Sequence, residues 1–325
     1  MFGRLFENLE PFGANRLSEK PLLTTNHRWK KLPEGEFKKG ESFLLAHEKF
    51  CVSACSGFLR IKAGIKANNT GYLPKENKGN VWYLPSCEGE IAALIVHNRR
   101  CLFPVFAGQN HIPNLRFLEK AYFLAKTPFS GKVPIHAIQG LRRDVELLES
   151  LMEKQGYLVS ESIDYDLMIL DGKQRPIALK PGPKGLVLRP PKPEDEDGLF
   201  ALHSAYEQEE VLTKKSVFNP EASRLNLKHI LSRESVLVAE MDGRLVAKIN
   251  TNAESFNRVQ IGGVYVHPHY RRKGIAAVMS MVFTQGLLEN GKNLTLFVKK
   301  RNLAARKVYH NIGFDFLADF RINYY

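Results

Sequence analysis

This sequence has little cysteine and no long apolar run. Its 325 residues contain four cysteines, at positions 51, 55, 87 and 101, too few and too scattered for the disulfide framework of a small secreted domain. Cys51 and Cys55 share one face of a predicted helix, but no second pair of ligands with suitable spacing completes a zinc site. We therefore expect these two thiols to be buried and free.

Membrane and export signals are also missing. No stretch approaches the roughly 20 uninterrupted apolar residues that a membrane span needs. The start of the chain carries charges at Arg4, Glu7 and Glu10 and lacks the apolar centre of a signal peptide. The expected location is the cytoplasm, with no membrane partner.

Acidic residues are too few to balance the basic ones, and the net charge is +13. The excess is divided almost equally between residues 1–180 and 181–325 and forms no basic tail, so a nucleic-acid partner is not expected. The distribution suits a protein that binds a small, multiply anionic ligand. RNA binding and a generally basic surface without a specific partner are the alternatives.

The chain is long enough for two domains. Residues 171–197 contain six prolines and three glycines, which interrupt both helices and central strands. We place a linker at residues 176–184, between a first domain, 1–175, and a second domain, 185–325.

Apolar patterns and turn residues predict a regular order of elements in the second domain. Asp242-Gly243 between two apolar runs is a strong hairpin signal, and the acidic residues after Pro193 suit the first turn of a helix. The predicted strands are 185–189, 235–241, 244–251, 258–266, 293–299 and 316–325, and the predicted helices are 193–211, 220–232, 276–289 and 302–312. This order indicates an α/β fold with a mixed sheet and helices on both faces.

The first domain is less regular in sequence. A helix is expected at 40–61 and a loop at 69–80, followed by a hairpin that turns at Asn98-Arg99. The remaining predictions are a strand at 133–140, a helix at 141–155 and a pair of strands within 156–170.

Residues 267–277 have the features of an anion-binding turn. Pro268 ends a strand, and Gly274 permits a backbone conformation that a side chain would oppose. Such a turn leaves unpaired N–H groups at the positive end of the following helix. Positive charge and small residues complete the pattern: Arg271, Arg272, Lys273, Ala276 and Ala277. The segment therefore predicts a diphosphate site, whereas the alternative, metal binding by its two histidines, has no third ligand in view.

A second, independent pattern lies in "NLAARKVYHNIGF", residues 302–314. Asn302, Ala305 and Tyr309 lie along one face of a predicted helix, which ends at Gly313. Asn302 begins this helix, where its side chain can cap the first turn or face a ligand.

Together the two segments resemble the Gcn5-related N-acetyltransferase (GNAT) superfamily. "VYVHPHYRRKGIA" is similar to the strand and pyrophosphate loop that bind acetyl-coenzyme A in that family, and "NLAARKVYHNIGF" is similar to its signature helix. The resemblance covers about residues 185–325. It implies transfer of an acetyl or other short acyl group from coenzyme A to an amine by direct attack, with no metal.

The resemblance also implies roles for single residues. The backbone of Val264, Tyr265 and Val266 would bind the pantetheine arm and polarise the thioester carbonyl. Tyr309 would act as general acid on the departing thiolate, with a plain core tyrosine as the alternative. The other cofactor contacts would come from Arg271, Arg272, Lys273, Gly274, Ile275, Ala276, Ala277 and Asn302. The cofactor would lie in a V-shaped opening between the strands 258–266 and 293–299.

The general base is not evident. Many relatives carry a glutamate in the strand that corresponds to 258–266, but here Gln260 can orient a water and cannot take a proton. Glu254, Glu209 and Glu210 are the acids at hand. The last two would border the acceptor pocket or lie on a solvated helix end. The acceptor, a small-molecule or peptide amine, and the oligomeric state stay open.

The first domain repeats part of the pattern of the second. Aligning Gly156-Tyr157 with Gly313-Phe314, an offset of 157 residues, overlays the helix 141–155 on the signature helix. The chemistry does not repeat, because the positions of Asn302, Ala305 and Tyr309 are taken by Val145, Leu148 and Met152. We interpret the first domain as a degenerate acetyltransferase-like domain in a tandem fold. An unrelated α+β domain is the alternative.

Two other functions stay open at this point. An aminoacyl or peptidoglycan-type transferase also pairs domains of this fold, but it needs an RNA-borne donor, and the intact diphosphate turn argues against that. A non-catalytic module would bind acyl-coenzyme A or a partner protein without turnover. The sequence also leaves open whether the strand 316–325 pairs within its own domain or reaches into the other.

Overall fold

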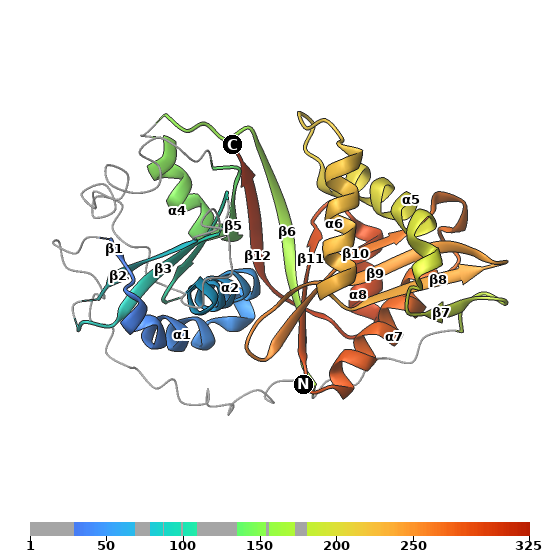
Figure 1. The fold of residues 1–325 in the computed structure, drawn as a ribbon, viewed down its shortest axis with the longest axis horizontal. Coiled ribbons are helices and arrows are strands. Elements are labelled where there is room, and N and C mark those ends of the chain that lie inside the picture. The colour runs from blue at the N-terminus through green and yellow to red at the C-terminus, as the bar shows by residue number, and fades with distance from the viewer. Residues whose placement is uncertain are drawn as a thin grey trace, which may run out of the picture.

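The computed structural model describes residues 29–68, 79–86, 88–98, 100–108, 135–153, 156–172 and 181–325. Within these residues, twelve strands form one sheet in the order β1-β2-β3-β4-β5-β12-β6-β11-β10-β9-β8-β7, with both parallel and antiparallel pairs. Helices pack on both faces of the sheet (Figure 1). The mixed α/β fold is therefore confirmed. Most of the predicted loop 69–80, together with Cys87 and Arg99, lies outside the described residues.

The strands are β1 (Lys30–Lys31), β2 (Asn80–Pro85), β3 (Ile91–Asn98), β4 (Cys101–Phe106), β5 (Ala137–Leu141), β6 (Glu161–Leu170), β7 (Val187–Arg189), β8 (Val236–Met241), β9 (Arg244–Glu254), β10 (Arg258–Val266), β11 (Asn293–Lys299) and β12 (Asp315–Tyr324). The helices are α1 (Phe37–Ala46), α2 (Val52–Asn68), α4 (Arg142–Glu153), α5 (Glu196–Tyr206), α6 (Pro220–Arg233), α7 (Ile275–Glu289) and α8 (Leu303–Asn311). No helix among the described residues is both long and apolar enough to cross a membrane.

Side chains that alternate along β3 bury both faces of the first half of the sheet. Leu94 and Val96 pack against α1 and α2, in one core with Phe58. Ile95, between them in the chain, packs on the opposite face with Val145 of α4. Cys51 and Cys55 belong to the α1–α2 side. Both thiols are buried and free, with their sulfurs 3.6 Å apart, as expected.

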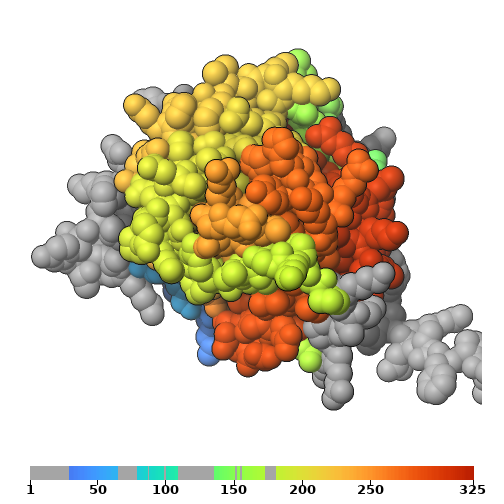
Figure 2. Space-filling view, turned by 90° about the vertical axis from the view of Figure 1, so that its right-hand side faces the viewer, coloured from blue at the N-terminus to red at the C-terminus, as the bar shows by residue number. Residues whose placement is uncertain are grey.

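The second half is layered in the same way. Ile249 of β9 packs with Met279 of α7 on one face. On the other face, Val238 of β8 packs with Leu199 of α5 and Leu227 of α6. Figure 2 looks onto this end of the sheet, with α5 and α6 on one side of the sheet edge and α7 on the other.

Local sequence signals explain these elements. Asp242 and Gly243 both have positive φ, 50° and 72°, as a tight hairpin turn requires, and β8 pairs with β9 across them. Asn219 caps α6 by accepting a hydrogen bond from the Ala222 amide at 3.0 Å, and Pro220 takes the first helical position.

Two predictions for the first half were wrong in detail. The predicted helix 40–61 is two helices, α1 and α2, separated around His47–Cys51. Glu48 in that break accepts hydrogen bonds from the Ser255 hydroxyl and the Asn257 amide, both at 2.6 Å, so a contact with the β9–β10 connection fixes the break. The predicted pair of strands within 156–170 is the single strand β6, because residues 156–160 lead into it without pairing as a strand of their own.

The two halves of the chain exchange strands. β12, from the end of the chain, lies between β5 and β6, while β6, from the first half, lies between β11 and β12 (Figure 1). Arg321 of β12 binds Asp164 of β6 at 2.7 Å and Glu146 of α4 at 3.0 Å. The last strand therefore reaches into the first half, and the proposed division at residues 176–184 stays a prediction.

Among the described residues, each half contains one parallel strand pair that is followed by a helix. β4 pairs with β5 before α4, and β10 pairs with β11 before α8. Together with the symmetric strand exchange, this repeat supports an origin by duplication. The degenerate character of the first half remains an interpretation.

Candidate functional site

A bulge in β10 interrupts the regular sheet. β10 pairs with β9 at Gly262↔Asn250 and next at Tyr265↔Lys248, so β10 has one residue more than β9 between these pairs. Gly263, inside the bulge, has a φ of 59°, in the left-handed region that glycine adopts without strain.

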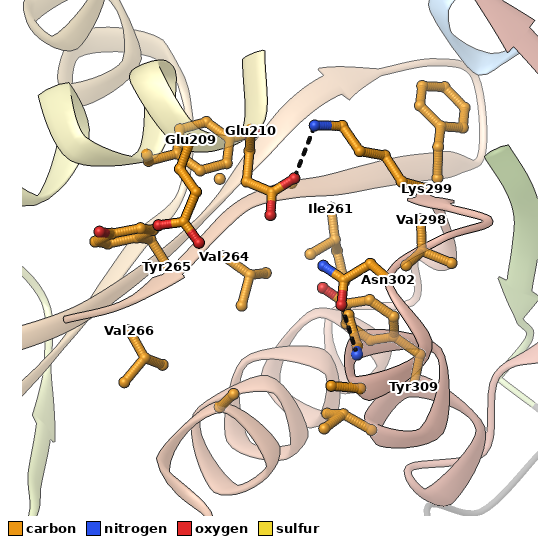
Figure 3. A pocket seen from close by; sticks show the side chains of 18 of the residues that line it. Glu209, Glu210, Ile261, Val264, Tyr265, Val266, Val298, Lys299, Asn302 and Tyr309 are labelled. Atoms are coloured by element: carbon orange, nitrogen blue, oxygen red, sulfur yellow. Dashed lines mark hydrogen bonds and ion pairs between the residues drawn. The ribbon is translucent and has the colours of Figure 1, made fainter. Parts of the chain in front are cut away.

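Beyond the bulge, β10 and β11 separate. Their last paired residues are Ile261 and Leu296, although both strands continue. The opening holds a cavity of about 640 Å³, with the segment 264–266 on one wall and Val298 and Lys299 on the other (Figure 3). This geometry agrees with the V-shaped opening that the sequence predicts.

The turn after β10 borders one end of this cavity. Arg272 has a φ of 62° and Gly274 a φ of 81°, and α7 begins directly afterwards. The Nε of Arg271 donates to the Val266 carbonyl at 3.0 Å, which fixes the side chain beside the end of the strand. Most of the predicted diphosphate residues line the cavity: Arg271, Arg272, Gly274, Ile275, Ala276 and Ala277. The positive end of α7 therefore borders the cavity.

Two carboxylates from the segment after α5 lie across the cavity from α7 and α8 (Figure 3). Glu209 pairs with Arg271 at 2.6 Å, and the hydrogen bond from this guanidinium lowers the pKa of the Glu209 carboxyl. Glu210 pairs with Lys299 at 2.9 Å (Figure 3). Both acids are therefore held by cations that also line the cavity.

Tyr309 of α8 and Asn302, the residue directly before α8, line the cavity. Tyr309 is buried, and this burial raises the pKa of its phenol, so the group is protonated at neutral pH. The Asn302 side chain accepts a hydrogen bond from the Ala305 amide at 3.1 Å and so caps α8. Asn302 therefore both caps α8 and forms part of the cavity wall.

Two of the predicted site residues do not line the cavity. Glu254 is the last residue of β9. Its side chain is largely exposed and pairs with Lys292. Lys273 points its ammonium at the Tyr270 ring, 5.1 Å from the ring centroid. His267 and His269 stack on each other at 5.2 Å, and no group of three possible metal ligands occurs among the described residues.

Other lining residues carry no local signal in the sequence. Gln139 of β5 and Tyr165 of β6 reach the cavity from the first half, and Tyr324 comes from β12. Only the strand exchange brings them there. Gln260 also lines the cavity, and its side-chain oxygen accepts a hydrogen bond from Ser53 of α2 at 2.8 Å, so the first half also holds this residue in place.

Comparison with known proteins connects these features to one family. The model of the acetyltransferase (GNAT) family matches residues 199–314, which include β10, the turn before α7, and α8. No curated protein matches the chain closely enough to count as a relative.

Solved structures show the same fold over nearly the whole chain. A Drosophila protein has a TM-score of 0.62 at 11% identity, covering 92% of this chain and 99% of its own. A tandem GNAT protein from the clavulanic acid biosynthesis pathway, without acetyl-coenzyme A, has a TM-score of 0.55 at 12% identity, covering 92% and 98%. A GCN5-related N-acetyltransferase from Sphaerobacter thermophilus has a TM-score of 0.53 at 15% identity, covering 91% and 94%.

The family match contains β10, the turn before α7, and α8, and the fold similarity extends over both halves of the chain. Residues 199–314 therefore match the acetyltransferase (GNAT) family, within a chain whose fold is similar to that of a tandem GNAT protein.

Proposed function

We propose that this protein transfers an acetyl or other short acyl group from coenzyme A to a primary amine. The observation that carries the proposal is the single cavity of about 640 Å³, which joins the start of α7 to Tyr309. The proposed diphosphate site and the proposed proton donor would thus be connected through the backbone segment 264–266, at which the two strands have separated.

The residues at the α7 end suit the diphosphate of coenzyme A. Arg271 and Arg272 supply positive charge beside a helix N-terminus. A Cβ built on Gly274 would meet no atom within 4 Å, so the backbone of the turn is open on this side. Within the cavity, the segment 264–266 can bind the amides of the pantetheine arm, since β11 does not pair with it. Acetyl-coenzyme A, once bound, supplies the activated acyl group as a thioester.

The proposed reaction is direct attack of a neutral amine on the thioester carbonyl. A C–N bond forms, the C–S bond breaks, and the amine loses a proton to water or to a base. Tyr309 donates its phenolic proton to the departing sulfur and regains a proton from solvent, a role that suits a phenol whose burial keeps it protonated. The products are an amide and a thiol, and the rate gain comes mainly from positioning and carbonyl polarisation.

Glu209 and Glu210 are the acids that we propose as acceptor contacts. They lie on the cavity wall, so an incoming ammonium group can exchange places with their present cation partners, and it must lose a proton before the neutral amine attacks. Glu254 has no part in the proposal. The same proposal assigns the protein to the cytoplasm, where free thiols such as Cys51 and Cys55 persist.

A substitution at Tyr309 tests the chemistry. Tyr309→Phe removes only the phenolic oxygen, so we expect kcat to fall roughly 100-fold or more, with little change in KM for acetyl-coenzyme A. Thiol release measured against a panel of primary amines gives both constants. Tyr83→Phe, in β2 and away from the cavity, is the control and keeps full activity. Equal kcat values for Tyr309→Phe and the parent protein would rule out the general-acid role.

A further inference from the structure

A row of polar side chains lies behind the bulge of β10. Lys248, Asn250 and Asn252 alternate along β9, so they share one face of the sheet. Lys248 and Asn250 are only 2% and 1% exposed. Burial of polar groups in a sheet is unfavourable unless they form hydrogen bonds. The burial of this row therefore needs a physical reason.

The row occupies the space that β10 leaves open. A Cβ on Gly262 would lie 1.9 Å from Nδ2 of Asn252, and a Cβ on Gly263 would lie 1.9 Å from Oδ1 of Asn250. The two glycines and the polar row are therefore sterically matched. No larger residue fits at Gly262 or Gly263 while the row is in place.

Two side chains lie against the backbone of Gly263, and one of them binds its carbonyl. Its carbonyl accepts a hydrogen bond from Nζ of Lys248 at 3.0 Å, and the same Nζ donates to Oδ1 of Asn250 at 3.0 Å. The phenol of Tyr206, which lines the cavity, lies close enough to the backbone of Gly263 for that backbone to lower its pKa, against the larger rise that burial causes. In a regular strand the backbone groups of Gly263 would bond to neighbouring strands. Here Lys248 replaces the missing ladder bond at the carbonyl, and the Tyr206 ring packs against the Lys248 amine end.

The surroundings of Lys248 favour its neutral amine. The Tyr206 ring lies 4.7 Å from Nζ, and Glu207 is the charged group that raises the pKa of the amine. Burial outweighs that effect and lowers the pKa of Lys248 to about 7. An apolar side chain would avoid this cost but could not donate a hydrogen bond to the Gly263 carbonyl.

We propose that Lys248 and Tyr206 are positioning residues that fix the Gly263 bulge, so that the backbone of Val264 to Val266 faces the cavity and stays apart from β11. The proposal rests on the proposed function for its catalytic consequence. Neither residue takes part in bond making. Each acts through the peptide groups of Gly263.

The test compares Lys248→Met and Tyr206→Phe with the parent protein. Without either side chain the bulge is less well fixed, so we expect the Kd and KM for acetyl-coenzyme A to rise about tenfold and kcat to fall. We also expect the backbone amides of residues 263–266 to exchange faster with deuterium. Tyr206→Phe removes a single oxygen, and so it keeps the test open if Lys248→Met does not fold.

Arg258→Met is the matched control. Arg258, at the start of β10, is likewise buried and also donates to a backbone carbonyl, that of Leu294 at 2.9 Å, but it does not line the cavity. This variant should lose stability without a change in the Kd for acetyl-coenzyme A or in amide exchange at 263–266.

Two results would separate failure of this inference from failure of the proposed function. If the parent protein binds no acetyl-coenzyme A, the proposed function fails, and amide exchange at 263–266 alone still decides the role of Lys248 and Tyr206. If both variants melt earlier, as Arg258→Met does, but keep parental exchange at 263–266, the two residues are merely structural and the inference is overturned.

Discussion

Burial sets the protonation of several single residues in this protein. Tyr309 keeps its proton because its phenol is buried at the cavity wall. Asp144, at the start of α4, shows the same effect in an acid. Its carboxyl is 2% exposed and accepts a hydrogen bond from the Phe106 amide at 3.3 Å, at the end of β4. Arg143 pairs with it at 3.1 Å, yet burial outweighs both interactions and raises the pKa of Asp144 to about 7.

This pKa gives a prediction for stability. An exposed aspartate titrates near pH 4, so between about pH 4 and 7 the folded protein binds a proton at Asp144 that the unfolded chain does not. The free energy of unfolding should therefore fall as the pH rises through this range, by at most about 1.4 kcal/mol per pH unit from this group.

Asp144→Asn should remove that slope, because the amide cannot titrate and its oxygen still accepts from the Phe106 amide. Urea unfolding of both proteins between pH 4 and 8 measures the difference. The free energy of unfolding of the variant should rise relative to that of the parent up to about pH 7, and the difference should stay constant above that pH. Parallel stability curves across the range would show that Asp144 ionises normally.

At the scale of elements, local signals predicted most of the second half correctly. Asp242-Gly243 correctly predicted the hairpin, and Asn302 correctly predicted the start of α8, because turns and caps depend on neighbours in the chain. The predicted helix 40–61 failed for the opposite reason. Its break at Glu48 depends on Ser255, which is 207 residues away.

The residues of the candidate site likewise fall into those that local patterns predict and those that they do not. Arg271, Gly274 and Tyr309 could be predicted, since their spacing within one turn or one helix is a local property. Gln139 and Tyr165 could not, because they reach the cavity only through the exchange of β6 and β12. The Lys248–Gly263 contact could not be predicted either, since it joins two strands across a bulge that no local pattern predicts.

At the scale of the whole molecule, the exchanged strands join the two halves into one sheet. β6 has neighbours only from the second half, β11 and β12, and β12 lies between two strands of the first, β5 and β6. Neither half can complete its hydrogen bonding alone. The two should therefore unfold together, whatever their evolutionary origin.

Thermal unfolding tests this coupling. The two tryptophans of the chain, Trp29 and Trp82, lie in the first half, so their fluorescence reports that half, whereas far-ultraviolet circular dichroism reports the whole sheet. We expect the two probes to give the same Tm in one transition. Separate transitions would mean that the halves are independent domains and that the exchange contributes little to stability.

We propose that the turn before α7 binds the diphosphate of coenzyme A. Calorimetric titration of acetyl-coenzyme A tests it most directly, with Gly274→Asp as the variant and Gly185→Asp as its control. Both glycines have nearly the same φ, 81° and 82°, and open space around a built Cβ, so the backbone strain is matched. Only Gly274→Asp adds a carboxylate at the cavity. We expect micromolar binding by the parent protein and by Gly185→Asp, and none by Gly274→Asp. No binding by the parent, or equal binding by both variants, would contradict it.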